Sequence, residues 1–106
     1  MSSYDYTGEE RRHAPRHPLR LTATIRQRGG RRINVDLRDI STHGFGCEYA
    51  STLNIGEQMW LKFDHLEAMD VVVIRRDGFY YGLSFVTPLH QSAVDHLIAQ
   101  YAKLAA

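Results

Sequence analysis

The sequence contains one cysteine, Cys47, and no long uninterrupted run of apolar residues. A single cysteine excludes an internal disulfide bond, and the lack of roughly 18 consecutive apolar residues excludes a membrane-spanning helix. No charged segment followed by an apolar run, the pattern of a secretory signal, occurs near residue 1. We therefore expect a soluble protein of a reducing compartment, the cytoplasm, without membrane insertion.

The sequence also lacks a surplus of charge of one sign. Its formal net charge is +1, whereas domains that grip polymeric DNA or RNA usually carry a larger basic surplus. Hydrophobic residues make up 43% of the 106 residues and charged residues 24%, which is the balance of a globular protein. This length suffices for one domain with one modest core.

Most of the chain has the pattern of short β-strands joined by tight turns. Residues 1–10 are polar and aperiodic, so we expect a flexible leader there. Apolar and polar residues then alternate through 19–25 and 33–37, which is the period of a half-buried strand. Gly29–Gly30 between them suits the positive φ angles of a hairpin turn, and Asp77–Gly78 is a second hairpin signal.

Four further strands complete the predicted fold. They are indicated by Phe45, Cys47 and Tyr49; by Met59, Leu61 and Phe63; by 71–74; and by Phe79, Tyr81, Leu83 and Phe85. About six short strands at this spacing favour a closed barrel or a sandwich over alternating strands and helices. We assign the barrel to 19–86. A stripe of helical period predicts a C-terminal helix over 88–104, with Ser92 and Asp95 as its capping box.

The alternation breaks at Asp39, where an inward-facing position would hold an acid. A bulge or strand end near 38–40 resolves the conflict, because it turns Asp39 outward and leaves Ser41 to Gly44 as a loop. The carboxylate then accepts hydrogen bonds from the N–H groups of a base, and the hydroxyl can bond a phosphate or a base edge. Gly44 allows close approach of the backbone or a positive φ. Alternatively, Ser41 only forms a serine turn that ends the strand.

Three arginines, Arg11, Arg12 and Arg16, precede the first strand. They can form a solvated basic face, as charged side chains mostly do. Pro15 and Pro18 disfavour a helix here, however, so we expect an extended arm over 11–18 at the barrel edge. Guanidinium groups match phosphate oxygens or the O6/N7 edge of guanine and also stack on bases. A guanine nucleotide satisfies all three modes of contact.

These motifs resemble those of the PilZ family of cyclic di-GMP receptors. "RRHAPR" at 11–16 resembles the family's RxxxR element with a preceding arginine, and "DISTHG" at 39–44 resembles its D/NxSxxG element. The order of the two motifs and the intervening hairpin also agree. The resemblance continues through "IGEQMWLKF" and "VVVIRRDGFYYGLSF" to the final helix, so it covers nearly the whole chain and defines a PilZ-like domain over 11–106.

The family resemblance implies a six-stranded antiparallel β-barrel with a C-terminal α-helix, which binds cyclic di-GMP outside the barrel in bacterial second-messenger signalling. It implies a receptor and not an enzyme. The implied ligand-binding residues are Arg11, Arg12, Arg16, Asp39, Ser41 and Gly44. An arginine before RxxxR accompanies two ligand molecules per domain in the family. Some members place an aromatic residue over a base, where this chain has Arg75 and Arg76. Either arginine can stack on the base instead, with Arg76 as the candidate secondary contact, or this contact is absent.

No effector domain is recognisable, so we expect an N-terminal arm that changes conformation on binding and signals to an unidentified partner protein in trans. One alternative is a PilZ-type interaction module that does not bind the nucleotide. Another is a small barrel that binds single-stranded nucleic acid through aromatic residues such as Trp60. Salt-dependent binding to oligonucleotides would distinguish the latter.

Metal binding and catalysis are not expected. His43 and Cys47 are four residues apart, but on a strand this spacing spans about 13 Å, too far for a shared zinc ion. The residue types of a hydrolase triad occur in Asp39, Ser41 and His43, yet neighbours along one short loop rarely align into a relay. We therefore expect no metal, no resident cofactor and no catalytic residue.

Overall fold

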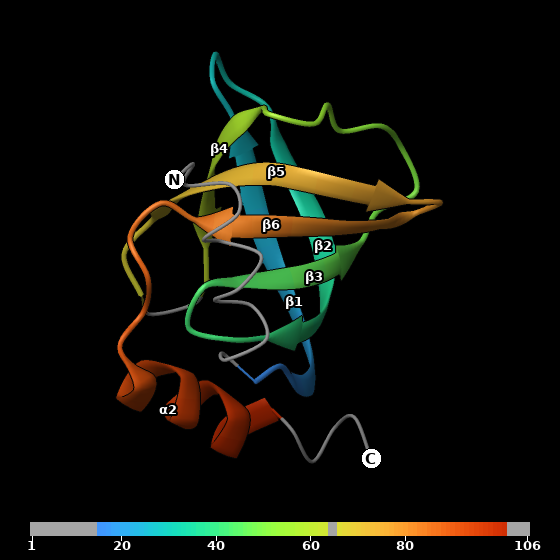
Figure 1. The fold of residues 1–106 in the computed structure, drawn as a ribbon. Helices are drawn as coiled ribbons and strands as arrows, with labels where there is room; N and C mark the ends of the chain where they lie inside the picture. The colour runs from blue at the N-terminus through green and yellow to red at the C-terminus, as the bar shows by residue number, and fades with distance from the viewer. Residues whose placement is uncertain (1–14, 64–65, 102–106) are drawn as a thin grey trace, which may run out of the picture.

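The computed structural model describes residues 15–63 and 66–101 (Figure 1). Its elements are β1 (His17–Gln27), β2 (Arg32–Ile40), β3 (Gly44–Glu48), β4 (Gln58–Lys62), β5 (Met69–Asp77), β6 (Tyr80–Phe85) and α2 (Gln91–Tyr101). The strands form a closed antiparallel barrel in the order β1-β2-β3-β6-β5-β4. The predicted fold class is therefore confirmed.

Two glycine-containing turns set the hairpins that were predicted. Gly29 and Gly30 adopt φ angles of 93° and 137° between β1 and β2, and Gly78 adopts 64° between β5 and β6. Residues with a Cβ rarely adopt such angles, which is why these turns contain glycine. The pairing of β1 with β2 extends from this turn to His17, which lies opposite Ile40. Because β1 begins at His17, only 15 and 16 of the predicted arm precede the barrel among the described residues.

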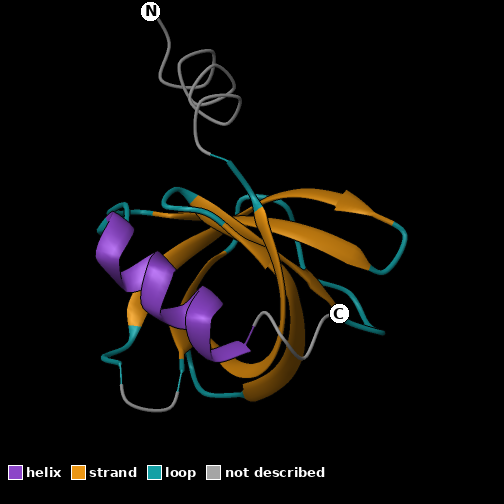
Figure 2. Cartoon of the chain, turned by 90° about the horizontal axis from the view of Figure 1, so that it is seen from below, coloured by secondary structure: helices purple, strands orange, loops and turns teal. Residues whose placement is uncertain are grey.

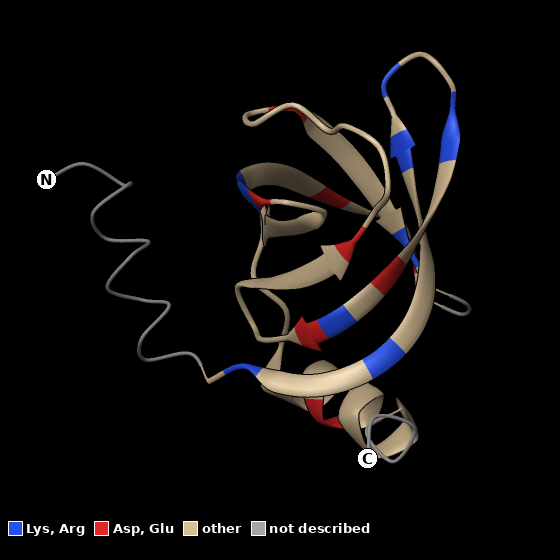
Figure 3. Ribbon diagram, turned by 90° about the vertical axis from the view of Figure 1, so that its right-hand side faces the viewer, with Lys and Arg blue, Asp and Glu red and all other residues tan. Residues whose placement is uncertain are grey.

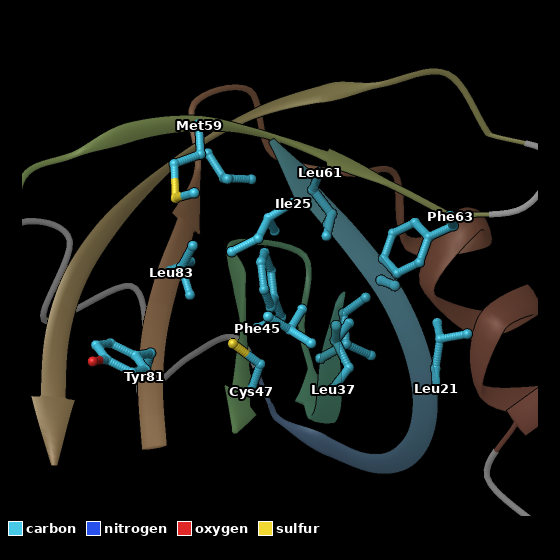
Figure 4. Packing of buried hydrophobic residues seen from close by; sticks show 14 of the residues in the cluster. Leu21, Ile25, Leu37, Phe45, Cys47, Met59, Leu61, Phe63, Tyr81 and Leu83 are labelled. Atoms are coloured by element: carbon cyan, nitrogen blue, oxygen red, sulfur yellow. The ribbon is translucent and has the colours of Figure 1, made fainter. Parts of the chain in front are cut away.

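Alternate side chains of the strands fill the barrel. Figure 4 shows residues of β1, β2, β3, β4 and β6, including Ile25, Phe45 and Leu83, directed into one interior. Val71 and Val73 of β5 belong to the same buried cluster. The ring centroids of Phe45 and Phe85 are 5.6 Å apart in a tilted arrangement. Burying a large apolar side chain contributes about 1.5–3 kcal/mol to the free energy of unfolding, so these buried side chains are the main source of the stability of the barrel.

Helix α2 covers one end of the barrel and contacts β1 (Figure 2). Val94 and Leu97 are buried, as the helical stripe predicts, and Ile98 and Tyr101 pack against the core. None of the described residues belongs to a helix long and apolar enough to cross a membrane.

Two details of the sequence prediction are wrong. Phe79 was assigned to a strand with its alternate neighbours, but it lies in the β5–β6 turn and is 63% exposed. Helix α2 begins at Gln91, so Ser92 lies inside it and does not cap it. The carbonyl of His90 accepts the first helical hydrogen bonds, and Asp95 accepts a bond of 3.0 Å from Gln91 Nε2. The helix therefore begins at Gln91 and not at Pro88, where the predicted range started.

Candidate functional site

A row of outward-facing residues crosses four neighbouring strands. Asp39 on β2 pairs with Gly46 on β3, Gly46 pairs with Gly82 on β6, and Gly82 pairs with Arg75 on β5. On the other side, Asp39 pairs with Pro18 of β1. Cross-strand neighbours lie about 5 Å apart, so these residues form one continuous line. We call Asp39, Gly46, Gly82 and Arg75 the outer row.

Two bulges place the charged ends of the outer row outside the barrel. The register shifts between Leu37 and Asp39 in β2, and again between Val73 and Arg75 in β5. Each extra residue reverses the alternation, so a residue that would face inward faces outward instead. The bulge near 38–40 predicted from the sequence is confirmed. The bulge in β5 was not predicted. Residues 71–74 are all apolar, so the sequence does not show which of them face inward or where the alternation changes.

The carboxylate of Asp39 joins the arginine arm to the barrel. Arg16 Nη1 donates to Asp39 Oδ1 at 2.8 Å, and the Tyr80 hydroxyl donates to Asp39 Oδ2. The side chains of Arg16 and Asp39 are only 28% and 20% exposed. This part-buried position strengthens their interaction relative to a fully exposed ion pair. The structure thus brings one residue of each sequence motif into direct contact.

The neighbouring charged residues Arg38 and Asp39 of β2 form ion pairs with different side chains. Acidic and basic residues are neighbours along this strand (Figure 3). Arg38, the extra residue of the bulge, bonds Glu48 through Nε at 2.8 Å and through Nη2. Arg38 therefore pairs with Glu48 and not with Asp39. The Arg38 side chain is 29% exposed, which is close to the exposure of the Arg16 side chain.

Ser41 has a structural position in the turn that follows β2. Its side chain is buried, and its Oγ accepts hydrogen bonds from the N–H groups of His43 and Gly44 at 3.2 and 3.3 Å. The Ser41 N–H donates to the Gly44 carbonyl at 2.8 Å. This is the serine turn weighed as the alternative in the sequence. The hydroxyl points into this turn, which lies beside Asp39, and its hydrogen bonds order the turn.

Gly44 is required by packing of the backbone. A Cβ at this position would overlap the carbonyl oxygen of Leu83 on β6 and lie 3.3 Å from Ser84 Cα. Of the two roles considered for Gly44, close approach of another chain segment therefore applies, and the close neighbour is β6. Gly44 is not among the glycines with positive φ.

The two arginines of β5 occupy different places. Arg75 lies in the outer row, with its Cζ atom 6.0 Å from the centroid of the Tyr80 ring. Arg76 lies over the Tyr81 ring at 5.6 Å, and its Nε donates to the Gly78 carbonyl at 3.0 Å. Arg76 therefore interacts with the hairpin turn, whereas Arg75 faces the outer row. Arg11 and Arg12 lie outside the described residues.

A narrow crevice adjoins the outer row. It is lined by Arg16, Ser41, His43, Gly44, Ile74, Leu83 and Ser84. Its volume of about 10 Å³ is close to that of a single water-sized sphere. A nucleotide at this place would consequently lie across the outer surface of the barrel and not inside a cavity.

Burial raises the pKa of two groups near the site. The pKa of Tyr80 is raised above its ordinary value of 10.0 by desolvation and then by its hydrogen bond to Asp39. Desolvation also raises the pKa of the Cys47 thiol to about 12, with smaller contributions from nearby carboxylates. Tyr80 thus keeps its proton at neutral pH and remains a hydrogen-bond donor to Asp39.

Sequence reasoning missed Tyr80 and gave no preference to Arg75. A signal for Tyr80 was present, because it is out of phase with the inward-facing Tyr81 and Leu83 and shares a face with Gly82. In residues 15–63 and 66–101 there is no cluster of three or more His, Cys, Asp or Glu side chains arranged to hold a metal ion.

Comparison with known protein families yields a match. A family model described as "PilZ domain" matches residues 10–103. This range includes both sequence motifs, the whole barrel and helix α2. No curated protein matches the chain.

Proposed function

The chain belongs to the PilZ domain family, and from this premise we propose that it is a receptor for cyclic di-GMP. PilZ domains are in general binding modules for this nucleotide and not catalysts. The proposal for this chain adds the site: the arginine arm and the outer face of the barrel near Asp39. A partner protein would receive the signal in trans.

The observation that supports the proposal most directly is the contact between Arg16 and Asp39. It joins the RxxxR and D/NxSxxG motifs at 2.8 Å, although 23 positions separate the two residues in the chain. A guanidinium group donates to phosphate oxygens or to guanine O6 and N7. A carboxylate accepts from the N–H groups of guanine. The pair therefore presents both kinds of group that a guanine nucleotide requires.

The other motif residues have supporting parts in this proposal. Ser41 and Gly44 hold the turn that fixes the end of β2, and so they set the direction of Asp39. Arg11 and Arg12 would contribute further donors to the two phosphates. With Arg11 present, we propose two ligand molecules per domain.

Binding would change the conformation of the arm. The phosphates attract the arginines of 11–16 toward the barrel, and the altered arm changes the surface offered to a partner. A ligand can cause this shift only to the extent that it binds one arm conformation more tightly than another. The contact of Arg16 with Asp39 is then shared with the ligand or exchanged for it.

Isothermal titration of the purified protein with cyclic di-GMP tests the proposal. GTP and a linear GG dinucleotide serve as controls. We expect selective binding of the cyclic dinucleotide. Loss of one arginine or carboxylate contact costs about 1–3 kcal/mol, so Arg12→Ala, Arg16→Ala and Asp39→Ala should each weaken binding roughly 5- to 150-fold.

Arg38→Ala is the matched control for Arg16→Ala, because the two arginines are equally exposed and each pairs with a carboxylate. Arg38→Ala should leave the affinity unchanged. Unchanged affinity in all three site variants would overturn the site. No binding by the folded wild-type protein would overturn the receptor function and favour an interaction module that does not use the nucleotide.

A further inference from the structure

Two glycines face outward beside Asp39 without any backbone need for glycine. Gly46 and Gly82 are directly paired in the middle of the outer row, on β3 and β6. Neither is among the residues with positive φ. Glycine in a strand interior is destabilising by about 0.5–1 kcal/mol relative to alanine, and it often marks a place where another group approaches the backbone closely. At these two positions the barrel backbone therefore has no side chains of its own on the outer face. We call this part of the surface the Gly46–Gly82 strip.

Tyr80 and Arg75 cover this strip in the structure. The Tyr80 hydroxyl occupies the space that a Cβ of Gly46 would fill, and Asp39 Oδ2 lies 2.7 Å from the same point. The Arg75 side chain lies over Gly82, with Cγ and Nε both 2.9 Å from the position of a Cβ. The Arg75 guanidinium in turn lies 6.0 Å from the Tyr80 ring centroid. An aromatic ring and a planar cation thus rest on the two glycines.

Tyr80 makes the contact with Asp39 that a guanine ring would make. Its hydroxyl donates to Oδ2, as the N1–H or N2–H group of guanine would. A planar ring that meets Asp39 edge-on from the side of β3 must lie over Gly46, since Gly46 is the cross-strand neighbour of Asp39 there. The space on the other side of Asp39 belongs to Pro18.

We propose that the Gly46–Gly82 strip is the seat of one guanine ring of the ligand, and that Tyr80 competes with this ring for the seat and for Asp39. The proposal rests on the proposed function as a cyclic di-GMP receptor. When the guanine enters, Tyr80 turns away from Gly46. Arg75 remains beside the strip, where a guanidinium can stack on a base.

This competition lowers affinity, and Asp39 supplies selectivity. Because the seat is open only when Tyr80 has left it, the apparent dissociation constant rises by the reciprocal of the open fraction. Guanine repays the lost bond with two neighbouring donors toward the carboxylate. Adenine offers one donor, and its N1 acceptor faces a carboxylate that can only accept. Asp39 therefore disfavours a cyclic adenine dinucleotide, whereas Tyr80 weakens the binding of both dinucleotides by the same factor.

Titration of the full chain with cyclic di-GMP tests the competition through Tyr80→Phe, which keeps the ring and removes the hydroxyl. A hydrogen bond to a charged group has a net worth that corresponds to roughly tenfold in an equilibrium constant, so Tyr80→Phe should bind about tenfold more tightly than wild type. Tyr49→Phe is the matched control, because Tyr49 packs against the core outside the outer row. It should bind as wild type does.

A second variant tests the seat itself. Gly46→Ala in the Tyr80→Phe background places a methyl group on the strip. The backbone there has no positive φ, but the ring at position 80 and the Asp39 carboxylate must shift away from the new Cβ. We expect this double variant to bind at least about tenfold more weakly than Tyr80→Phe. Its thermal unfolding, followed by circular dichroism, verifies that it is folded.

The outcomes separate the two claims. Tighter binding by Tyr80→Phe together with weaker binding by the double variant supports the seat and the competition. If wild type binds and Tyr80→Phe binds equally or more weakly, the competition is overturned and the receptor function stands. If the double variant binds as Tyr80→Phe does, the seat is overturned. If neither wild type nor Tyr80→Phe binds, the proposed receptor function is overturned.

Discussion

The inner and outer faces of β2, β3, β6 and β5 carry opposite kinds of residue at adjacent positions. Ile40, Phe45, Leu83 and Val73 form an inward line across these strands. The outer row of Asp39, Gly46, Gly82 and Arg75 lies one position away on β2, β3 and β6, and two positions away on the bulged β5. The inward line is apolar and fully buried, whereas the outer row holds charges and glycines. The comparison teaches that one set of strands buries apolar side chains on one face and presents charged side chains and glycines on the other.

The two faces also depend on different features of the sequence. The inward line follows from strict alternation, which any half-buried strand displays. The outer row depends on the bulges in β2 and β5, because without them Asp39 and Arg75 would face the interior. Each bulge therefore moves a charged residue from the inner face of the barrel wall to its outer face.

The largest effect should come from truncating the inward line. Phe45→Ala leaves a cavity in a close-packed core and should reduce the free energy of unfolding by about 3–5 kcal/mol. Asp39→Ala, in the outer row, removes a part-buried ion pair and should change that quantity by about 1 kcal/mol. Urea denaturation measures both. Equal destabilisation by the two variants would abolish the distinction between the faces.

An intermediate effect is expected at Ser41, the buried member of the D/NxSxxG motif. Ser41→Ala leaves the N–H groups of His43 and Gly44 without the acceptor they use, and it should lower the free energy of unfolding by about 1–2 kcal/mol. Faster hydrogen exchange of the Gly44 amide should accompany the loss. The exposed Ser92→Ala is the control. Unchanged stability with lost nucleotide binding would instead place Ser41 in direct contact with the ligand.

The smallest effect at neutral pH concerns Cys47, which is on the inner face beside the outer row. Burial raises the pKa of its thiol from 9.0 to about 12, so the folded protein binds this proton more tightly than the unfolded chain. The resulting stabilisation is fully present below pH 9 and is lost as the pH rises toward 12. At pH 8 a thiol reagent should modify Cys47 only after unfolding in urea. Rapid modification of the native protein would show that the inner face is open there.

Much of the fold could be predicted from the sequence, because alternation and glycine turns are local signals. Asp39 could be found as well, since an acid at an inward position signals a break in the strand. Tyr80 was not found, and Arg75 was named without preference over Arg76, because the contact between Tyr80 and Arg75 depends on cross-strand register and on a bulge in β5. The inward orientation of the Ser41 hydroxyl likewise depends on the turn that the folded chain forms.

The most direct test of the account is a nuclear magnetic resonance titration of the ¹⁵N-labelled protein with cyclic di-GMP. The amides of Gly46 and Gly82 report on the outer row, and those of Thr24 and Trp60 report on the wall formed by β1 and β4. We predict that the largest chemical-shift changes occur at Asp39, Gly46 and Gly82, with small changes at Thr24 and Trp60. Saturable changes confined to β1 and β4, with the outer row unaffected, would contradict the account.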